Sequence, residues 1–375
     1  MTQHHRSSRR AAPIVATLGL ALVAAACGSS SSKVASTTTA AAGATTTAAA
    51  TTAAAAGATT AAAGAGSIKK GLTVYYIPKD TQNPYEVLAD KGGQTALEEL
   101  GGKVVVSSGT EDTAAAQIPS IQAAISAKAD AIVIAGNDPD ALCPSLAQAQ
   151  AAGVKVIAFD SDVKCPNHLF INQADTETIG RSQVQLLASM IDKKGEIAIL
   201  SAAATATNQN AWIDFMKKEL PNFPDMKLVD TVYGNDDPAT SLTVLLGLLS
   251  AHPNLKGIIS PTTVGISTAA QYMSTHPELK GKLVLTGLGL PSQMKPYIKD
   301  GTVAKFALWN PIDLGYLAGY AAASLASGTA DLKDGAKFTA GRLKDYTIKS
   351  GDGGLSIVLG PPQVFDASNI DNFNF

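Results

Sequence analysis

The stretch LTVYYIPKDTQNPYEVLADKGGQTALEELGGKVVVS, residues 72–107, decides the fold of this chain. It begins with a short apolar run, Leu72–Pro78, that is typical of a buried strand. The apolar residues of Pro84–Leu100 then recur at helical spacing, with proline early in the first turn. Gly101-Gly102 ends this helix, and a second strand, Lys103–Ser107, follows. Strand, helix and strand in this order predict two parallel strands joined by a crossover helix.

The same alternation continues along the chain beyond residue 107. The expected strands are 131–135, 154–160, 168–172, 196–201, 227–233, 255–260, 283–288 and 304–309. The expected helices are 113–128, 139–152, 176–193, 208–219, 238–251, 264–276, 292–300 and 311–327. From residue 341 onward only short strands, 346–349 and 355–359, and a polar end are expected. One sheet of ordinary size does not hold this many strands. The sequence therefore predicts an α/β fold of two doubly wound lobes with parallel sheets.

An apolar segment with a basic start precedes this region. Arg9 and Arg10 stand before the apolar run Ala11–Val23, and three alanines stand before Cys27. This is the pattern of a secretion signal, and the run is shorter than the roughly 20 residues that span a bilayer. A cysteine directly after small residues resembles the lipobox of bacterial lipoproteins, although Ala24 stands where leucine is more usual. We predict a signal peptide over residues 1–26 and a lipid on Cys27; the alternative is an ordinary signal peptide with an unrelated cysteine.

Residues 27–67 consist almost wholly of Ala, Thr, Ser and Gly. Such a stretch has no large apolar side chains to bury, so nothing offsets the entropy lost when it becomes ordered. We therefore predict a disordered tether between a lipid anchor and the folded body. The expected location is the extracytoplasmic face of the cell membrane.

The charge and cysteine content narrow the class of protein further. The 29 basic and 31 acidic residues form no basic face or run, which argues against a nucleic-acid partner. No stretch after Cys27 is long and apolar enough to cross a membrane, so the lipid is the expected membrane contact. Once Cys27 is set aside, Cys143 and Cys165 remain. In an oxidising compartment this even number favours a disulfide, and two separate buried thiols are the alternative.

Polar residues stand at the ends of the predicted strands, where parallel sheets bind their ligands. Carboxylates and side-chain amides bridge neighbouring hydroxyls, and an aromatic face covers the C–H side of a sugar ring. A convergence of such groups with little bulk charge is typical of a sugar site. The candidate ligand-binding residues are Lys79, Asn83, Asn137, Asp160, Asn208, Gln209, Pro261, Thr263, Trp309 and Asn310.

The enzymatic alternatives lack the residues that they need. Gly287-Leu288-Gly289 follows a strand, but the third glycine and the acid of a dinucleotide site are missing. No phosphate-binding loop and no nucleophile elbow occur. Asp160, Asp162, Cys165 and His168 lie close together, but their spacing matches no structural zinc site. Asp160 and Asp162 leave one strand and need not converge on one glycosidic bond. We expect no catalytic residue, metal or cofactor.

Taken together, these features resemble the type I solute-binding proteins of sugar ABC importers, and among them the rhamnose-binding and autoinducer-2-binding branch. The resemblance covers the chain from Leu72 to its last residues. The segments that carry it are Ile77–Lys79, Asn137–Pro144, Phe159–Asp162, Ile171–Asp175, Asn208–Trp212, Tyr233–Asp237, Leu308–Pro311 and Asn369–Asp371.

The resemblance also implies which subgroup is nearer. Four positions agree with the ligand-holding residues of autoinducer-2 receptors, namely Lys79, Asp160, Gln209 and Pro261. Two positions depart from that pattern: Asn208 stands where those receptors have Asp, and Thr263 where they have Ala. An amide in place of a carboxylate replaces an acceptor oxygen by a donor, so hydroxyl pairing changes. Both departures weigh against autoinducer-2, and the segments Asn208–Asn210 and Trp309–Pro311 look more like those of the rhamnose importers. A simpler interpretation of Asn208 is a helix N-cap, and of Trp309 a core residue.

The resemblance implies a monomeric receptor that closes over a monosaccharide and passes it to an ABC permease driven by an ATPase. The expected lobes are residues 68–162 with 311–339, and residues 163–310 with 340–375, joined by three hinge strands. Rhamnose leads among the candidate sugars, ahead of other deoxy sugars, pentoses, polyols and autoinducer-2. The rival functions are a secreted sugar-processing enzyme and a sensor that binds sugar without import.

Overall fold

The computed structural model describes residues 67–351 and 353–375. These residues belong to one compact unit, Ala61–Phe375. The predicted signal peptide, the lipid on Cys27 and all of the predicted tether except Ser67 lie outside the described residues. Within the described ranges, no helix is long and apolar enough to span a membrane.

The first lobe is built on a seven-stranded sheet in the order β13-β14-β5-β4-β3-β1-β2. All of its neighbouring strands run parallel except β13 and β14, which form an antiparallel pair. The central strands are almost completely buried, because helices cover both faces of the sheet. The strands are β1 (Thr73–Ile77), β2 (Lys103–Val106), β3 (Ala131–Ile134), β4 (Lys155–Phe159), β5 (Leu169–Asn172), β13 (Lys349–Gly351) and β14 (Gly354–Val358).

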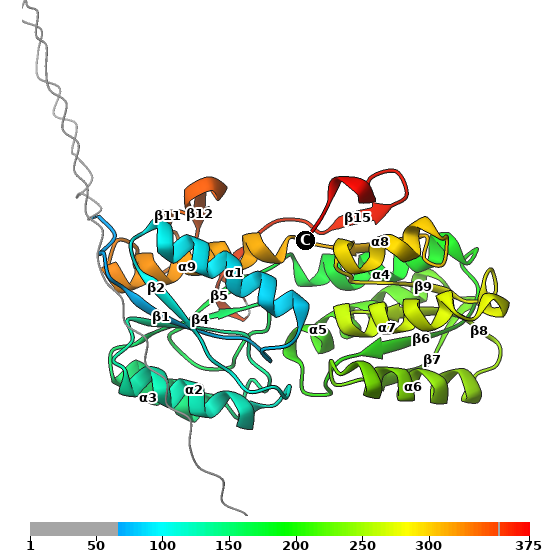
Figure 1. The fold of residues 1–375 in the computed structure, drawn as a ribbon, viewed down its shortest axis with the longest axis horizontal. Helices are drawn as coiled ribbons and strands as arrows, with labels where there is room; N and C mark the ends of the chain where they lie inside the picture. Colours follow the sequence, from blue (N-terminus) through cyan, green and yellow to red (C-terminus); the bar gives the residue numbers. More distant parts are fainter. Residues whose placement is uncertain (1–66, 352) are drawn as a thin grey trace, which may run out of the picture. The chain divides into compact units, whose positions relative to one another are not determined.

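Helices α1 (Pro84–Glu99) and α9 (Pro311–Ser327) cover one face of this sheet, and α2 (Ala114–Ser126) and α3 (Cys143–Ala151) cover the other (Figure 1). The backbones of α1 and α9 approach closely. A Cβ atom added at Gly315 would lie only 1.8 Å from the carbonyl oxygen of Ala89. Glycine at this position is therefore what allows the two helices to pack.

The second lobe contains a four-stranded parallel sheet in the order β7-β6-β8-β9. Its strands are β6 (Gly195–Ser201), β7 (Met226–Tyr233), β8 (Leu255–Ser260) and β9 (Val284–Gly287). Beside β9, β10 (Lys305–Leu308) forms an antiparallel pair with β15 (Gln363–Asp366). Helix α4 packs on α5, and α7 packs on α6 and α8. These helices are α4 (Thr176–Met190), α5 (Thr207–Glu219), α6 (Pro238–Ala251), α7 (Thr263–Ser274) and α8 (Pro291–Lys299).

The prediction of two doubly wound lobes is confirmed, but the expected lobe boundaries are wrong. The first lobe does not end at Asp162, because β5 pairs with β4. The tail after residue 340 does not belong wholly to the second lobe, because β14 pairs with β5. An apolar run predicts a strand without indicating which sheet the strand joins. In the described chain, the lobes are therefore connected between β5 and α4, between β10 and α9, and between β14 and β15.

Two local differences have simple causes. Helix α3 begins at Cys143 rather than at Pro139, because the carboxylate of Asp138 accepts hydrogen bonds from the backbone N–H groups of Asp140 and Ala141 and holds a turn there. The tail contains more strands than expected: β15 and β11 (Lys337–Thr339) were not predicted, and the expected strand 346–349 is divided between β12 (Asp345–Thr347), which pairs with β11, and β13.

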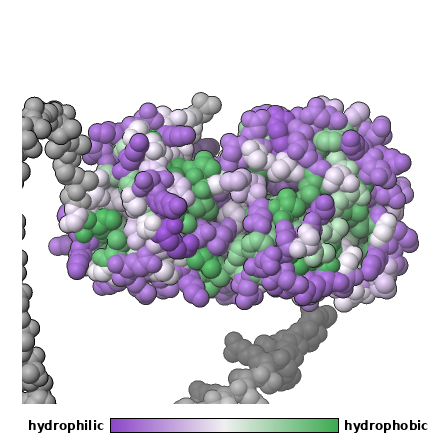
Figure 2. Space-filling model, turned by 90° about the horizontal axis from the view of Figure 1, so that it is seen from above, coloured by the Kyte–Doolittle hydropathy of each residue, from purple (hydrophilic) through white to green (hydrophobic). Residues whose placement is uncertain are grey.

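Cys143 and Cys165 form a disulfide, with their Cα atoms 5.2 Å apart. The bond joins the first residue of α3 to the loop that follows β4. On the face that Figure 2 shows, the surface of the protein is mostly hydrophilic, with smaller apolar patches.

Candidate functional site

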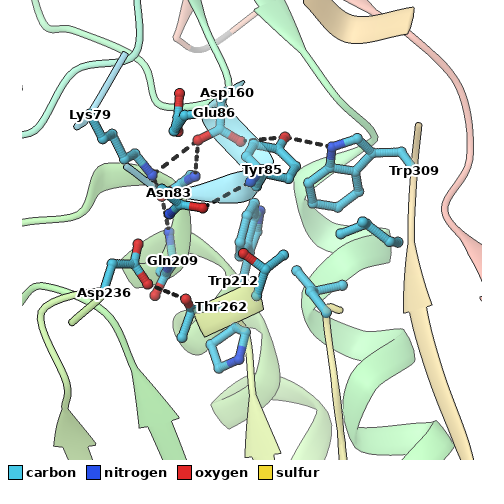
Figure 3. A pocket seen from close by; sticks show the side chains of 15 residues that line it. Lys79, Asn83, Tyr85, Glu86, Asp160, Gln209, Trp212, Asp236, Thr262 and Trp309 are labelled. Carbon is cyan, nitrogen blue, oxygen red and sulfur yellow. Dashed lines mark hydrogen bonds and ion pairs between the residues drawn. The ribbon is translucent and has the colours of Figure 1, made fainter. Parts of the chain in front are cut away.

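A pocket lies between the lobes at the carboxyl ends of the central strands (Figure 3). In the first sheet, β2 and β3 lie on opposite sides of β1, so the direction in which strands are added reverses there. In the second sheet, β7 and β8 lie on opposite sides of β6 in the same way. Such switch points are where open parallel sheets bind ligands. Side chains from the two lobes meet across the pocket, so that little free space remains in it in this arrangement. It is lined by Lys79, Asn83, Tyr85, Glu86, Asp160, Asn208, Gln209, Trp212, Asp236, Pro261, Thr262, Thr263, Leu288, Leu308 and Trp309.

A buried ion pair joins Lys79, after β1, to Asp160, after β4. The Lys79 Nζ lies 3.0 Å from the Asp160 Oδ2, and both side chains are 4% exposed. Burial alone would lower the pKa of Lys79, but Asp160 and further carboxylates hold it above its ordinary value. Because Asp160 balances this charge, the pair presents hydrogen-bonding groups with little net charge.

Asp160 is held in place by two aromatic residues. The Tyr85 hydroxyl donates to the Asp160 Oδ1 at 2.8 Å, and the Trp309 Nε1 donates to the Tyr85 hydroxyl oxygen at 2.7 Å. Trp212 and Trp309 meet edge to face, with ring centroids 5.8 Å apart. These indoles give the pocket an apolar wall beside its charged end, as Figure 3 shows.

Asn208 and Gln209 bring the second lobe to this pair from the first turn of α5. The Asn208 Nδ2 donates to the Asp160 Oδ2 at 2.9 Å, while its Oδ1 accepts from the Lys79 Nζ at 3.4 Å. The Gln209 Oε1 accepts from the Ser201 hydroxyl and the Ala202 N–H, so these bonds leave its Nε2 for other partners. Asn208 lies inside α5 and is not its N-cap, so the simpler interpretation of this residue is wrong.

Three more carboxyl groups surround the ion pair. Glu86 is 1% exposed, and burial, followed by the charge of Asp160, raises its pKa well above the ordinary value. Asp236 accepts a hydrogen bond from the Thr262 hydroxyl, and loss of solvent raises its pKa. Loss of solvent, followed by the charge of Asp236, raises the pKa of Asp112 to about 7. Asp112 and Asp236 also line an adjoining open cleft.

The structure brings together eight of the ten predicted ligand-binding residues, namely Lys79, Asn83, Asp160, Asn208, Gln209, Pro261, Thr263 and Trp309. Two do not line the pocket. Asn137 lies behind it, where its Nδ2 donates to the carbonyl oxygens of Lys79 and Thr113. Asn310 caps α9 by accepting from the Ile312 N–H. In this structure the amide groups of both residues bond to loop or helix backbone, and a ligand-binding role for them stays a prediction.

Seven lining residues were not predicted: Tyr85, Glu86, Trp212, Asp236, Thr262, Leu288 and Leu308. Asp236 and Thr262 follow predicted strands, and strand-end position was a signal that could have identified both. Tyr85, Glu86 and Trp212 lie within helices α1 and α5, where helical periodicity alone suggests core positions.

Asp162, Cys165 and His168, which lie close together in the sequence, are held together by hydrogen bonds near the disulfide. The His168 Nε2 lies 2.7 Å from the Asp162 Oδ1, and its Nδ1 lies 2.6 Å from the Cys165 carbonyl oxygen. Within residues 67–351 and 353–375, no group of three or more His, Cys, Asp or Glu side chains is arranged to hold a metal ion.

Comparison with known proteins gives a consistent picture. Residues 74–330 match a family model described as a periplasmic binding protein domain. An ABC transporter solute-binding protein from Clostridium phytofermentas, solved with bound L-rhamnose, is 38% identical, with 81% of this chain and 98% of that chain covered and a TM-score of 0.79. A sugar ABC transporter from Actinomyces odontolyticus is 43% identical, with 81% and 98% covered and a TM-score of 0.65.

More distant relatives have other ligands in their names. LsrB from Clostridium saccharobutylicum, solved in complex with AI-2, is 26% identical, with 81% of this chain and 100% of that chain covered and a TM-score of 0.76. The D-apiose import binding protein of Actinobacillus succinogenes is 26% identical over 180 residues, which are 48% of this chain and 57% of that protein. The chain thus spans less than two thirds of the length of this curated relative.

Proposed function

The chain belongs to the periplasmic binding protein domain family, and from this premise we propose that it is the sugar-binding subunit of an ABC importer. Its fold is the type I periplasmic binding protein fold, as in the rhamnose-bound relative. The proposed role is to capture a monosaccharide between the lobes and to deliver it, chemically unchanged, to a membrane permease driven by an ATPase.

The observation that carries this proposal is the chemistry of the interlobe pocket. Its one lysine is paired with Asp160, so a neutral ligand meets donors and acceptors rather than excess positive charge. The indoles of Trp212 and Trp309 can cover the C–H face of a sugar ring. Closure over the ligand would depend on contacts that exist only when both lobes touch it.

Rhamnose or a similar deoxy sugar is the ligand that we favour, ahead of polyols. A deoxy sugar carries a methyl group in addition to its hydroxyls, and the pocket combines polar groups with the apolar side chains of Leu288, Leu308 and Trp309. An apolar wall stabilises a methyl group by removing it from water. The rhamnose-bound relative supports the same choice.

Autoinducer-2 is the second candidate ligand, because Lys79, Asp160, Gln209 and Pro261 match the receptor pattern and all line the pocket. The contacts of Asn208 argue against it. The Asn208 Nδ2 donates to Asp160, whereas an aspartate at this position would put a second carboxylate beside Asp160 and change the hydrogen bonds offered to a ligand.

We also propose that the chain works outside the cell membrane as a monomer, held by a lipid on Cys27. The sequence pattern of residues 1–27 supports the anchor, and the family description supports the location. Metabolic labelling with a radioactive fatty acid tests the anchor. The label should enter the wild-type chain and be absent from Cys27→Ser.

The ligand is tested by calorimetric titration of the full chain with L-rhamnose, L-fucose, D-ribose, D-arabinose, xylitol and autoinducer-2. We expect L-rhamnose to bind most tightly and to be recovered unchanged. Tighter binding of autoinducer-2 would support the second candidate. A new sugar product would instead indicate an enzyme, and no binding to any of these compounds would refute the proposal.

Uptake of the sugar by cells tests import. Uptake that persists in cells that lack this protein would favour the sensing function.

A further inference from the structure

Glu86 is a buried carboxyl group that takes no part in the ion pair between Lys79 and Asp160. It lies in the first turn of α1, is 1% exposed and lines the pocket. Among the residues that the structure describes, none forms a hydrogen bond with its Oε2, and this atom is buried. A buried polar atom without a hydrogen-bond partner destabilises the folded protein, and a bound ligand could supply the missing partner.

The charges around Glu86 do not favour a carboxylate there. The positive charge of Lys79 acts on Glu86, but the Lys79 Nζ already forms an ion pair with Asp160 at 3.0 Å. No described cation forms an ion pair with Glu86 itself. An ionised Glu86 would therefore be desolvated beside the negative charge of Asp160, which strongly disfavours the charged form.

The influence of the neighbouring groups agrees with this account. Burial and Asp160 raise the pKa of Glu86, Lys79 lowers it, and Asp90 and Asp80 raise it further. Lys79 and Asp80 face it from the segment after β1, Asp160 from the loop after β4, and Asp90 from α1. The single cation thus offsets only part of the effect of burial and negative charge.

We propose that Glu86 is protonated in the ligand-free pocket and donates its carboxyl O–H to an acceptor oxygen of the bound sugar. This inference rests on the proposed function, because the partner is a sugar. The ring oxygen of a pyranose is the natural acceptor, since it has lone pairs and no hydrogen, whereas Asp160 accepts from hydroxyls. Sugar acids and sugar phosphates should bind more weakly than neutral sugars, because their negative charge would meet the carboxylate of Asp160.

Substitutions of Glu86 separate a donor from a charge. Glu86→Gln keeps the length of the side chain, one carbonyl acceptor and a neutral donor, so we expect L-rhamnose affinity within about threefold of wild type at neutral pH. Glu86→Leu removes the donor, and we expect binding weaker by about ten- to hundredfold. Glu219→Gln is the control, because Glu219 is a buried carboxylate bonded to Arg181 outside the pocket.

The pH dependence gives a second readout. Between about pH 5 and about pH 9, wild-type affinity should fall as the pH rises through the pKa of Glu86, because the donor is lost. Glu86→Gln should lack this component, although Asp112 and Asp236 still titrate in both proteins. Weak binding by Glu86→Gln, together with wild-type affinity that rises with pH, would show that the carboxylate form binds and would overturn the proposal.

Two further measurements keep the inference independent of the choice of sugar. If L-rhamnose does not bind, the tightest sugar of the calorimetric series replaces it. D-glucosamine that binds more tightly than D-glucose, with the gain lost in Glu86→Gln, would indicate an ion pair and overturn the proposal. In the ligand-free protein, infrared spectroscopy should show the carbonyl band of a protonated carboxylic acid that disappears in Glu86→Gln. Absence of this band overturns the proposal even if no sugar binds and the proposed function fails.

Discussion

Asp160 is the residue at which the polar contacts of the pocket meet. Its two carboxylate oxygens accept from Tyr85 and Asn208 and pair with Lys79. Its backbone has a φ of +58°, a conformation that aspartate adopts more readily than most residues. The strained turn after β4 therefore directs the carboxylate across the sheet edge toward the second lobe.

We expect Asp160→Ala to reduce sugar affinity more than about a hundredfold, because the central acceptor is lost and Lys79 is left unpaired. The protein should still fold, with a lower melting temperature. Calorimetric titration and circular dichroism measure the two effects. Asp331→Ala is the matched control, because Asp331 also pairs with a lysine, Lys333, but is exposed and does not line the pocket; its affinity should be unchanged. Normal binding by Asp160→Ala would remove Asp160 from the site.

We expect the choice between rhamnose and autoinducer-2 to depend on two side chains. Asn208→Asp combined with Thr263→Ala gives the chain the autoinducer-2 pattern. The new carboxylate would repel Asp160 and remove the amide donor, so we expect L-rhamnose affinity to fall about tenfold or more. Autoinducer-2 affinity should rise in the same titrations. If both affinities stay as in wild type, these positions do not determine specificity.

At the scale of elements, the loop from Asp160 to His168 is fixed at its far end. The disulfide joins Cys165 to the start of α3, and His168 contacts both Asp162 and the Cys165 carbonyl oxygen. Only short backbone segments then separate these anchors from Asp160. The loop between β4 and β5 should therefore be rigid, which helps to hold the carboxylate of Asp160, the proposed ligand-binding group, in position.

Loss of this disulfide should destabilise the first lobe. The two cysteines are separated by 22 residues, and a loop of this length contributes about 3 kcal/mol to the free energy of unfolding. Urea unfolding of Cys143→Ser with Cys165→Ser should show a decrease of this order relative to wild type. A reducing agent should lower wild-type stability and leave the double variant unaffected. Equal stability of the two proteins without reductant would contradict the expectation.

At the scale of the whole body, ligand capture depends on contacts between the lobes. Asn208 of the second lobe bonds to Asp160 of the first, and Trp309, where β10 ends, bonds to Tyr85 of α1. Three connections allow the lobes to rotate by small changes at a few backbone positions. A ligand that touches both lobes stabilises the closed arrangement by its extra contacts.

We expect sugar to shorten the distance between the lobes. Spin labels at Ser126→Cys and Lys256→Cys, both exposed positions on different lobes, report this distance by pulsed electron resonance. Addition of L-rhamnose should shift the distribution to shorter values, and the same labels with Asp160→Ala should show no shift. An unchanged distribution despite saturating sugar would exclude closure.

Much of the fold and part of the candidate site could be predicted from the sequence. Strands such as Ala131–Ile134 are recognisable because burial on both faces requires apolar side chains throughout. Asp160 and Pro261 were identified because the residue after a parallel strand must lie at the ligand-binding edge. Glu86 and Trp212 were missed, because a helical residue that faces a cleft has the same spacing as one that faces the core.

The sequence by itself determined the order of strands and helices and the polar residues at the strand ends, since these depend on local periodicity and on turn chemistry. The tertiary structure alone decided that β5 and β14 join the first sheet, that Asn208 reaches Asp160, and that the buried Glu86 Oε2 has no hydrogen-bond partner among the described residues. These outcomes depend on hydrogen bonds and charges between residues far apart in the chain. The residues that flank a position in the sequence do not indicate which distant residue it contacts in the folded chain.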